Sequence, residues 1–269
     1  MNNTFVKHIL NMLDLSKDLF ASNQHLVHET GSLNTKGAKT IEMDALMEQK
    51  LIEYVKQHNL PVKIYSEEIG VVDVHPHPEY LMCFDPLDGS TNYRVGKNLL
   101  PYGVLIAVFQ GLYPRFSEVI AAGALEATLG QIFFYDGEKT FDEQHKPVVL
   151  KKNWPIDKST PIYVDLHRRA YYDMYLNVVE KLYIRNAGST VGNLFYTLSN
   201  VSCGMGHPRI KPEEVGAVYG LLKGAGGIVI DHTGKSFEDM LFDLDHTYQI
   251  LGGAKNTTEF VAKQIGLNE

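Results

Sequence analysis

The stretch Phe84–Asn92 reads FDPLDGSTN and directly follows an apolar run, Tyr80–Phe84, that predicts a β-strand. Asp85 and Asp88 therefore stand at the end of that strand, three positions apart on a turn that the proline between them fixes. Two carboxylates on one tight turn can converge on a hard cation, and a sharp turn would point the carbonyl of Leu87 into the same space. The stretch thus indicates a candidate cation site.

The three residues after this pair carry a second kind of chemistry. Gly89, Ser90 and Thr91 open a turn or helix whose backbone N–H groups can cradle a phosphate. A purely structural reading is open as well, because Asp-Pro and Asp-Gly are common in turns and Asp or Ser often caps a helix. The nine residues taken alone do not decide between the two readings.

A pair of glutamates upstream favours the metal site. Glu67 and Glu68 follow a short predicted strand, Val62–Ser66, so they can reach the same edge of a sheet as Asp85 and Asp88. Three carboxylates around one point repel one another, and such a cluster is costly unless cations neutralise it.

Composition limits the classes of function. The 269 residues include 25 Lys plus Arg and 32 Asp plus Glu, a net charge of −7, and 44% are apolar, which is ordinary for a folded protein. The acidic balance argues against a nucleic acid partner. The two cysteines, Cys83 and Cys203, form no disulfide framework or zinc spacing, and the longest apolar run, Tyr102–Phe109, is too short to cross a membrane. Without the apolar run of a signal peptide near residue 1, we expect a cytoplasmic protein with no membrane partner.

The order of elements predicts stacked layers of helix and sheet, an α/β or layered α+β class. Two helices, about 4–20 and 41–58, are separated by a polar stretch, 23–39, that is typical of a loop. Consecutive strands follow from about 102 to 135, and strands then alternate with helices, one of them spanning about 169–182. A break in the pattern near Leu150–Ser159 predicts two halves, 1–150 and 151–269.

The stretch Asp85–Ser90, with Glu67–Glu68 upstream, resembles the hallmark of the lithium-sensitive, magnesium-dependent phosphatases. That family includes inositol monophosphatases, fructose-1,6-bisphosphatases and bisphosphate nucleotidases. The resemblance spans about residues 35–232 and continues through segments that lie in the same order in the family, namely Lys36, Thr40, Asp44, Arg185–Asn193 and Gly224–Gly227.

The resemblance implies a helix-sheet-helix-sheet-helix sandwich, a homodimer, and two or three Mg²⁺ ions, with Mn²⁺ as an alternative. Metal-ligating and catalytic roles follow from it residue by residue. Glu67 and the Ser90 hydroxyl would orient and deprotonate a metal-bound water, and Asp44 would hold waters of an outlying metal. The implied metal ligands are Glu67, Asp85, the Leu87 carbonyl, Asp88 and Glu214.

The expected reaction is hydrolysis of a small phosphate monoester, an inositol monophosphate or a related polyol or sugar phosphate. Fructose 1,6-bisphosphate is the alternative, a 3′(2′),5′-bisphosphate nucleotide the third, and a non-catalytic binder of phosphorylated ligand or metal is the rival from another class. Two departures motivate the alternatives, because Glu213–Glu214 replaces the usual Trp-Asp and His207 replaces a sugar-binding Glu. Substrate-binding residues expected besides His207 are Gly89, Ser90, Thr91, Gly188, Ser189 and Arg209.

Overall fold

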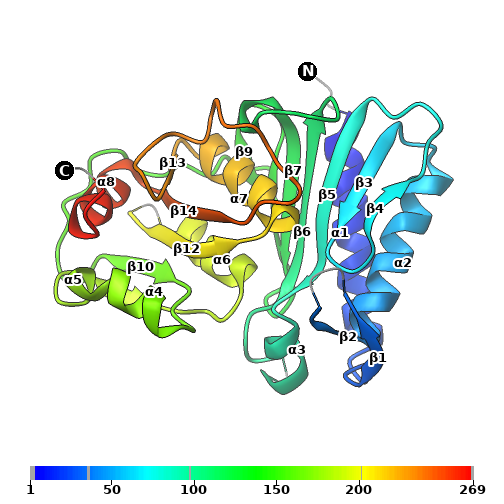
Figure 1. Cartoon of the computed structure of the whole chain (residues 1–269), viewed down its shortest axis with the longest axis horizontal. Helices are drawn as coiled ribbons and strands as arrows, with labels where there is room; N and C mark the ends of the chain where they lie inside the picture. The colour runs from blue at the N-terminus through cyan, green and yellow to red at the C-terminus, as the bar shows by residue number, and fades with distance from the viewer. Residues whose placement is uncertain (1–3, 35–36, 97, 201, 268–269) are drawn as a thin grey trace.

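The computed structural model describes residues 4–34, 37–96, 98–200 and 202–267, so Lys36 lies outside the described residues. Two sheets and three layers of helices stack in alternation, with α1 and α8 in opposite outer layers (Figure 1). This is the layered α/β sandwich that the sequence predicts. Within the described residues, no helix combines the length and apolarity needed to span a membrane.

The larger sheet has seven strands and carries the stretch on which the prediction of a cation site rests. Its central strands pair antiparallel, whereas β3 and β5 run parallel, so Ser66 and Phe84 end side by side. In spatial order the strands are β4 (Gly70–Asp73), β3 (Val62–Ser66), β5 (Tyr80–Asp88), β6 (Gly103–Gln110), β7 (Val119–Glu126), β8 (Gln131–Tyr135) and β9 (Thr140–Asp142).

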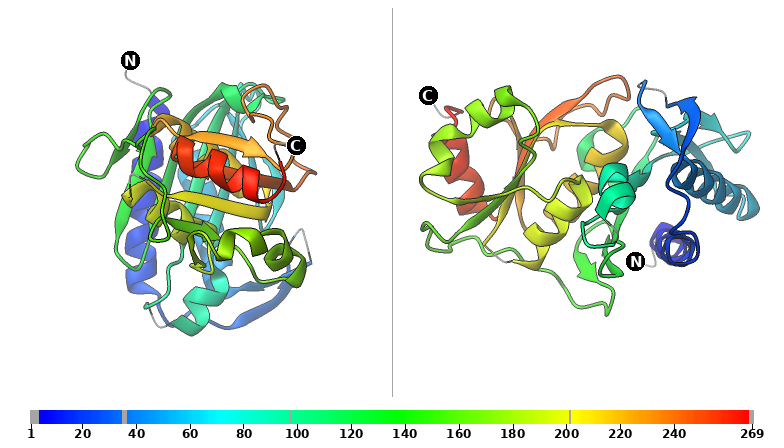
Figure 2. Two further views of the ribbon diagram at one scale, coloured as in Figure 1. Left: turned by 90° about the vertical axis from the view of Figure 1, so that its left-hand side faces the viewer. Right: turned by 90° about the horizontal axis from the view of Figure 1, so that it is seen from below.

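The smaller sheet has five strands and lies on the other side of a central helical layer (Figure 2). Its strands β10, β11 and β12 are parallel to one another, and β14 pairs antiparallel with both β12 and β13. In spatial order they are β11 (Tyr183–Arg185), β10 (Pro161–Val164), β12 (Gly204–Ile210), β14 (Tyr248–Gly253) and β13 (Ile228–Asp231).

The helices form an outer layer on each sheet and one layer between the sheets. Helices α1 (Thr4–Ser22) and α2 (Glu42–Gln57) cover the outer face of the larger sheet, and α6 (Thr190–Ser199) and α7 (Pro212–Gly224) lie between the sheets. The remaining helices are α3 (Ser90–Gly96), which follows β5, and, beyond the smaller sheet, α4 (Arg169–Met174), α5 (Leu176–Val179) and α8 (Lys255–Gln264).

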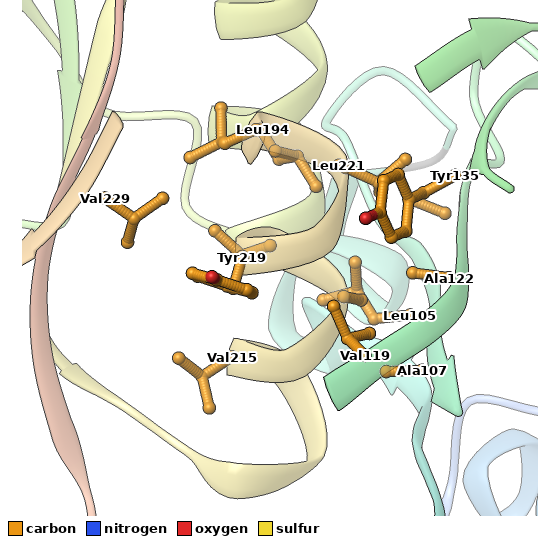
Figure 3. Close-up of a cluster of buried hydrophobic side chains, with 14 of the residues drawn as sticks. Leu105, Ala107, Val119, Ala122, Tyr135, Leu194, Val215, Tyr219, Leu221 and Val229 are labelled. Atoms are coloured by element: carbon orange, nitrogen blue, oxygen red, sulfur yellow. The ribbon is translucent and has the colours of Figure 1, made fainter. Parts of the chain in front are cut away.

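Helix α7 is apolar around most of its circumference because it is packed between both sheets. Val215 and Tyr219 lie on the side of Val229 from the smaller sheet, whereas the opposite side of the helix meets Ala107 and Ala122 from the larger one (Figure 3). A helix buried on all sides has little freedom to shift. Its first turn therefore holds Glu213 and Glu214 at a fixed place.

Three expectations about local structure were wrong. The polar stretch 23–39 includes β1 (Glu29–Leu33), which pairs antiparallel with β2 (Lys39–Ile41); every residue of β1 is exposed, so no apolar alternation marks it. The helix expected over 169–182 is divided at the buried Tyr175 into α4 and α5. Strand β5 continues through Asp88 rather than ending at Phe84.

Strand β12 was not predicted. Its sequence, Gly204–Ile210, contains two glycines and a proline, which weaken the pattern of a strand. Tertiary pairing with β10 and β14 on both sides overrides that local preference.

Candidate active site

A bulge at the end of β5 brings Asp85 and Asp88 to the same side of the sheet. Asp85 pairs with Leu105 and Asp88 with Gly103, so three steps along β5 match two steps along β6. The extra residue reverses the usual alternation, by which residues three apart would face opposite sides. Pro86 occupies the irregular stretch, where its missing N–H costs no ladder hydrogen bond.

Three buried carboxylates converge at this point. Ligand atoms of Asp85, Asp88 and Glu214 all lie within 4.8 Å of one another. The N-terminus of α6 orients two of them, because Asp88 accepts the backbone N–H groups of Thr190 (3.2 Å) and Val191 (2.6 Å). The Thr190 hydroxyl donates to Glu214 Oε2 at 2.7 Å. Elements far apart in the chain thus hold the cluster in place.

The electrostatics of the cluster suit a divalent cation. Burial, together with the negative charges of Glu67 and Asp88, raises the pKa of Asp85 well above its usual range. Burial and the neighbouring Glu214 raise the pKa of Asp88 to about 7, against the two α6 hydrogen bonds that lower it. A cation between the carboxylates would offset these costs, and an all-oxygen donor set is the one that Mg²⁺ and Mn²⁺ prefer. The residues therefore fit the metal that the resemblance implies.

Glu67 lies beside the cluster but is engaged by other partners. Its Oε1 accepts from the Lys211 ammonium group and from Asn34 Nδ2, the latter at 3.2 Å. Lys211 Nζ also lies 3.9 Å from Glu213 Oε1 and 3.7 Å from Glu214 Oε1. Burial lowers the pKa of Lys211, but the surrounding carboxylates outweigh it and hold this pKa above its usual value. No local pattern in the sequence indicates this contact, because Lys211 and Glu67 lie 144 positions apart.

Asp44 is near the cluster but outside the group of three carboxylates. Its Oδ2 accepts the backbone N–H of Ile41 at 2.9 Å, so it caps the first turn of α2. Burial raises the pKa of Asp44 to about 8, and the charges of Glu68 and Glu67 add to that effect. The carboxylate thus has a clear structural role, and it faces the same acidic surroundings as the expected metal ligands.

The turn after Asp88 places the start of α3 against the start of α6. Gly89 has φ +81°, and a Cβ added there would lie 2.8 Å from Ser189 Cβ and 3.2 Å from the Pro101 carbonyl oxygen. Ser90 begins α3 half-buried and Thr91 is exposed. Leu87 is buried, and its N–H donates to Asp85 Oδ1 at 2.9 Å.

A pocket of about 450 Å³ opens beside the carboxylates. Gly188 and Ser189 line one wall, and Ser189 Oγ already accepts the Gly192 N–H at 3.1 Å as the N-cap of α6. His207 and Arg209 of β12 line another wall, so these two expected substrate-binding residues also reach the pocket. Gly89, Ser90 and Thr91 are not among the residues lining it; the described lining also includes Asp88, Glu214, Asp165, His167, Arg168 and Lys211.

His207 enters the pocket as a neutral imidazole. Its Nδ1 accepts the backbone N–H of Arg209 at 3.2 Å, which places the ring proton on Nε2. Burial lowers the pKa of His207 to about 4, although Asp165, whose Oδ2 lies 3.6 Å from Nε2, acts in the opposite sense. The ring can therefore exchange hydrogen bonds with a hydroxyl group without contributing a charge.

The loop after β10 brings His167 and Arg168 to the pocket, whereas Arg169 is not among its lining residues. Arg168 lines the pocket and its Nε donates to His167 Nε2 at 3.2 Å, while His167 Nδ1 lies 2.7 Å from Asp165 Oδ1. Arg169 instead faces solvent, with 93% of its side chain exposed, 3.6 Å from Asp173. Asp165 was missed altogether. Its position after a strand parallel to β12 was the available signal, but β12 itself was not predicted.

A buried carboxylate cluster that fits a divalent ion, next to a pocket with basic side chains, is an arrangement suited to metal-assisted hydrolysis of a phosphate ester. The sequence profile of the inositol monophosphatase family matches residues 6–267. The chain belongs to that family and is a phosphoric monoester hydrolase.

Individual relatives are distant but cover most of the chain. A fructose-1,6-bisphosphatase/inositol-1-monophosphatase of Thermococcus kodakarensis is 26% identical over 81% of this chain and 80% of its own length. A fructose-1,6-bisphosphatase of Pyrococcus furiosus is 24% identical over 88% and 86%. The crystal structure of the extragenic suppressor protein suhB from Bartonella henselae superposes with a TM-score of 0.82 over 99% of this chain and 100% of that one, at 16% identity, and so shares the fold.

Proposed function

We propose that this phosphatase hydrolyses a small phosphate monoester, an inositol monophosphate or a related polyol or sugar phosphate, in a Mg²⁺-dependent reaction. The observation that carries the proposal is the convergence of Asp85, Asp88 and Glu214 within 4.8 Å, at the edge of a pocket about 450 Å³ in volume. A monoester dianion repels an attacking water, and bound Mg²⁺ would neutralise that charge and lower the pKa of the water. Mn²⁺ has the same preference for oxygen ligands.

The proposed roles follow the positions of the side chains. Asp85, Asp88, Glu214 and the Leu87 carbonyl would hold metal, with Glu67 as a further ligand and Asp44 facing its outer side. Glu67 and the Ser90 hydroxyl would orient the attacking water and take its proton. The N–H groups of Gly89, Ser90 and Thr91 would hold the phosphate, and Gly188, Ser189, His207 and Arg209 would hold the rest of the substrate.

The neutral His207 supports a polyol or sugar as the alcohol part of the substrate. A neutral imidazole can donate from Nε2 to a hydroxyl, and the pocket adds Asn193 and Asp165 as further polar groups. Gly188 and Ser189, expected to bind substrate, line the same space. Several polar groups around a pocket of this size suit a hydroxylated ring better than an apolar alcohol.

Fructose 1,6-bisphosphate is the second candidate, and the basic side chains favour it. Arg168 and Arg209 both line the pocket on the side away from the seven-stranded sheet, where they can meet a second phosphate. Two relatives over most of this chain are named for that activity. A 3′(2′),5′-bisphosphate nucleotide has no comparable support among these contacts and stays the third alternative.

Phosphate release in the presence and absence of Mg²⁺ tests the proposal, with inositol 1-phosphate, fructose 1,6-bisphosphate, adenosine 3′,5′-bisphosphate and simple sugar phosphates as substrates. We expect turnover that EDTA abolishes and that Asp85→Asn removes. Asp231→Asn, at the end of β13 away from the pocket, is the matched acid control and should retain activity. Metal-independent turnover, or turnover that survives Asp85→Asn, would overturn the proposal.

Other expectations from the sequence remain proposals. We propose a cytoplasmic homodimer without a nucleic acid or membrane partner, in which residues 1–150 form one half and 151–269 the other. The two halves would then supply different parts of one site, because Asp85 and Asp88 precede the proposed boundary and Glu214 follows it. Sedimentation of the purified chain would test the dimer.

A further inference from the structure

Lys211 is placed at the carboxylate cluster by a rigid backbone. It is the N-cap residue of α7, and Pro212 follows it in the first helical position. The Lys211 carbonyl accepts the N–H groups of Glu214 at 3.1 Å and Val215 at 2.9 Å. Because α7 is buried between the two sheets, the start of the Lys211 side chain cannot move far from the site.

The ammonium group of Lys211 reaches carboxylates from both sides of the site. It donates to Glu67, which follows β3 of the larger sheet, and lies 3.7 Å from Glu214 Oε1 and 3.9 Å from Glu213 Oε1 on α7. One third of the side chain, 33%, is exposed, and Lys211 is among the residues that line the pocket. The ammonium group therefore lies between Glu67 and α7, next to the pocket.

The contact with Lys211 separates Glu67 from the other three carboxylates of the site. Asp85, Asp88 and Glu214 form one group with ligand atoms within 4.8 Å, and Glu67 is not a member of it. Glu67 Oε1 instead points to Lys211 and to Asn34 Nδ2. Lys211 contacts Glu67 directly and lies farther, 3.7 Å, from Glu214 Oε1. A divalent ion in the group of three therefore repels the ammonium group but leaves its contact with Glu67 in place, whereas an ion bound by Glu67 must replace the ammonium group as its partner.

We propose that the Lys211 ammonium group is an internal cation that competes with a divalent ion for Glu67. The chain then binds one ion tightly at Asp85, Asp88 and Glu214, and a further ion only weakly, at the expense of the lysine contact. This inference rests on the proposed metal dependence and adds to it a residue that sets the number of ions held. The physical reason is repulsion between two cations that share one carboxylate.

Binding of Mn²⁺ to the full chain tests the inference without any assay of activity. The metal alone is the probe, with free Mn²⁺ measured by electron paramagnetic resonance after equilibrium dialysis at fixed pH. For the wild-type chain we expect one tight ion and a second at least about tenfold weaker. Lys211→Met should strengthen the second ion by about tenfold or more, and the first ion by clearly less, because Lys211 contacts Glu67 more closely than Glu214.

Two further variants serve as controls. Lys223→Met removes a lysine from the last turn of the same helix, 3.4 Å from the exposed Glu238, and should bind Mn²⁺ as the wild type does. Lys211→Arg keeps a cation at the site, so the second ion should stay weak. Metal-free Lys211→Met should melt at a lower temperature than the wild type, because Glu67 loses its cation, and should gain more from added Mn²⁺.

The outcomes separate this inference from the proposed function. An unchanged or weaker second ion in Lys211→Met overturns the inference and leaves the phosphatase proposal standing. No Mn²⁺ binding by the wild-type chain overturns both. If Lys211→Met does not fold, Lys211→Gln takes its place with the same expected result, and two wild-type ions of equal affinity overturn the inference.

Discussion

The acidic and basic sides of the candidate site are held in different ways. Asp85 and Asp88 are almost fully buried, and backbone N–H groups of Leu87, Thr190 and Val191 fix their carboxylates. On the opposite side, Arg168 and His167 lie on a loop and contact mainly each other and Asp165. The acidic side is buried and held by backbone hydrogen bonds, whereas the basic side consists of side chains from β12 and from the loop after β10.

The difference indicates that the acidic side binds metal and the basic side selects the substrate. A metal ion needs ligands at fixed distances, so rigid backbone contacts suit the acidic side. Choice of substrate needs only a few polar groups around a cavity, and these can change without disturbing the fold. Damage to the acidic side should therefore abolish turnover for every substrate, and damage to the basic side should alter which substrate is preferred.

The largest effect is expected on the acidic side. Asp88→Asn should lower kcat/KM by on the order of 10³-fold for every substrate tested, because a buried metal-binding charge is lost. The amide oxygen can accept only one of the two α6 N–H groups, so the loss of the other hydrogen bond offsets the relief of a buried charge, and the metal-free melting temperature should stay close to that of the wild type. Steady-state kinetics and thermal melts in EDTA measure both. Near wild-type turnover would contradict the assigned role, and Asp231→Asn provides the baseline.

A smaller and selective effect is expected on the basic side. Arg209→Met should raise KM for fructose 1,6-bisphosphate by about 10- to 100-fold and KM for a monophosphate much less, because a second phosphate loses more from the missing charge than a hydroxyl group does. Arg168→Met should act in the same direction. The matched control is Arg169→Met, whose side chain is 93% exposed and faces Asp173. Equal losses for both substrates would remove the basis for a second phosphate site.

His207 links the pocket to pH. Because burial lowers its pKa from 6.5 to about 4, the folded chain binds a proton there less readily than the unfolded chain does. The contribution of His207 to the free energy of unfolding is therefore fully present above about pH 6.5. It declines as pH falls toward about 4, by at most about 3 kcal/mol. Asp165 works against the shift, and His167 and Lys211 add to it.

Urea unfolding between about pH 7 and pH 4.5 in EDTA measures this effect as a difference between variants. His207→Gln should show a shallower loss of stability on acidification than the wild type, whereas His77→Gln, at an exposed loop position, should show the same loss. If the free energy of unfolding changes with pH equally in the wild type and in His207→Gln, the imidazole binds protons as readily in the folded chain as in the unfolded one.

The contrast between the two sides also explains which features could be predicted from the sequence. The motif Asp85–Ser90 is continuous, and its strand and turn follow from local patterns, so the metal cluster could be proposed before the fold was known. The layered class and most helices also followed from periodicity. Glu214 could be named only by resemblance, since its place beside Asp88 depends on α7 and α6 meeting β5.

Contacts between distant segments could not be predicted in this way. The bulge that turns Asp85 and Asp88 to one side depends on pairing with β6, and the Lys211 contact with Glu67 joins residues 144 positions apart. Strand β12 carries His207 and Arg209, yet its glycines and proline hide it from pattern analysis. Asp165 was missed for the same reason, because only the β10–β12 pairing places it near His207.

A final comparison concerns the turn at Gly89, where the start of α3 lies against the start of α6. Gly89 and Gly111 have nearly equal dihedral angles, φ +81° and +82°, but only Gly89 is crowded, with Ser189 Cβ at 2.8 Å from an added Cβ. Gly111→Ala therefore measures backbone strain alone, which is about 1 kcal/mol. Gly89→Ala should lower the free energy of unfolding by a further 1–3 kcal/mol or so, because Ser189 or the Pro101 carbonyl must shift.

Urea denaturation gives the free energy of unfolding of both variants, and the difference between them measures the crowding at Gly89. The m-values show whether either substitution changes the unfolded state. A shift of Ser189 would also move the N-terminus of α6, which holds Asp88, so Gly89→Ala should lose turnover in proportion to its extra instability, while Gly111→Ala should not. Equal unfolding free energies for the two variants would show that the start of α3 and the start of α6 can separate at little cost, and that the acidic side is less rigid than its backbone contacts indicate.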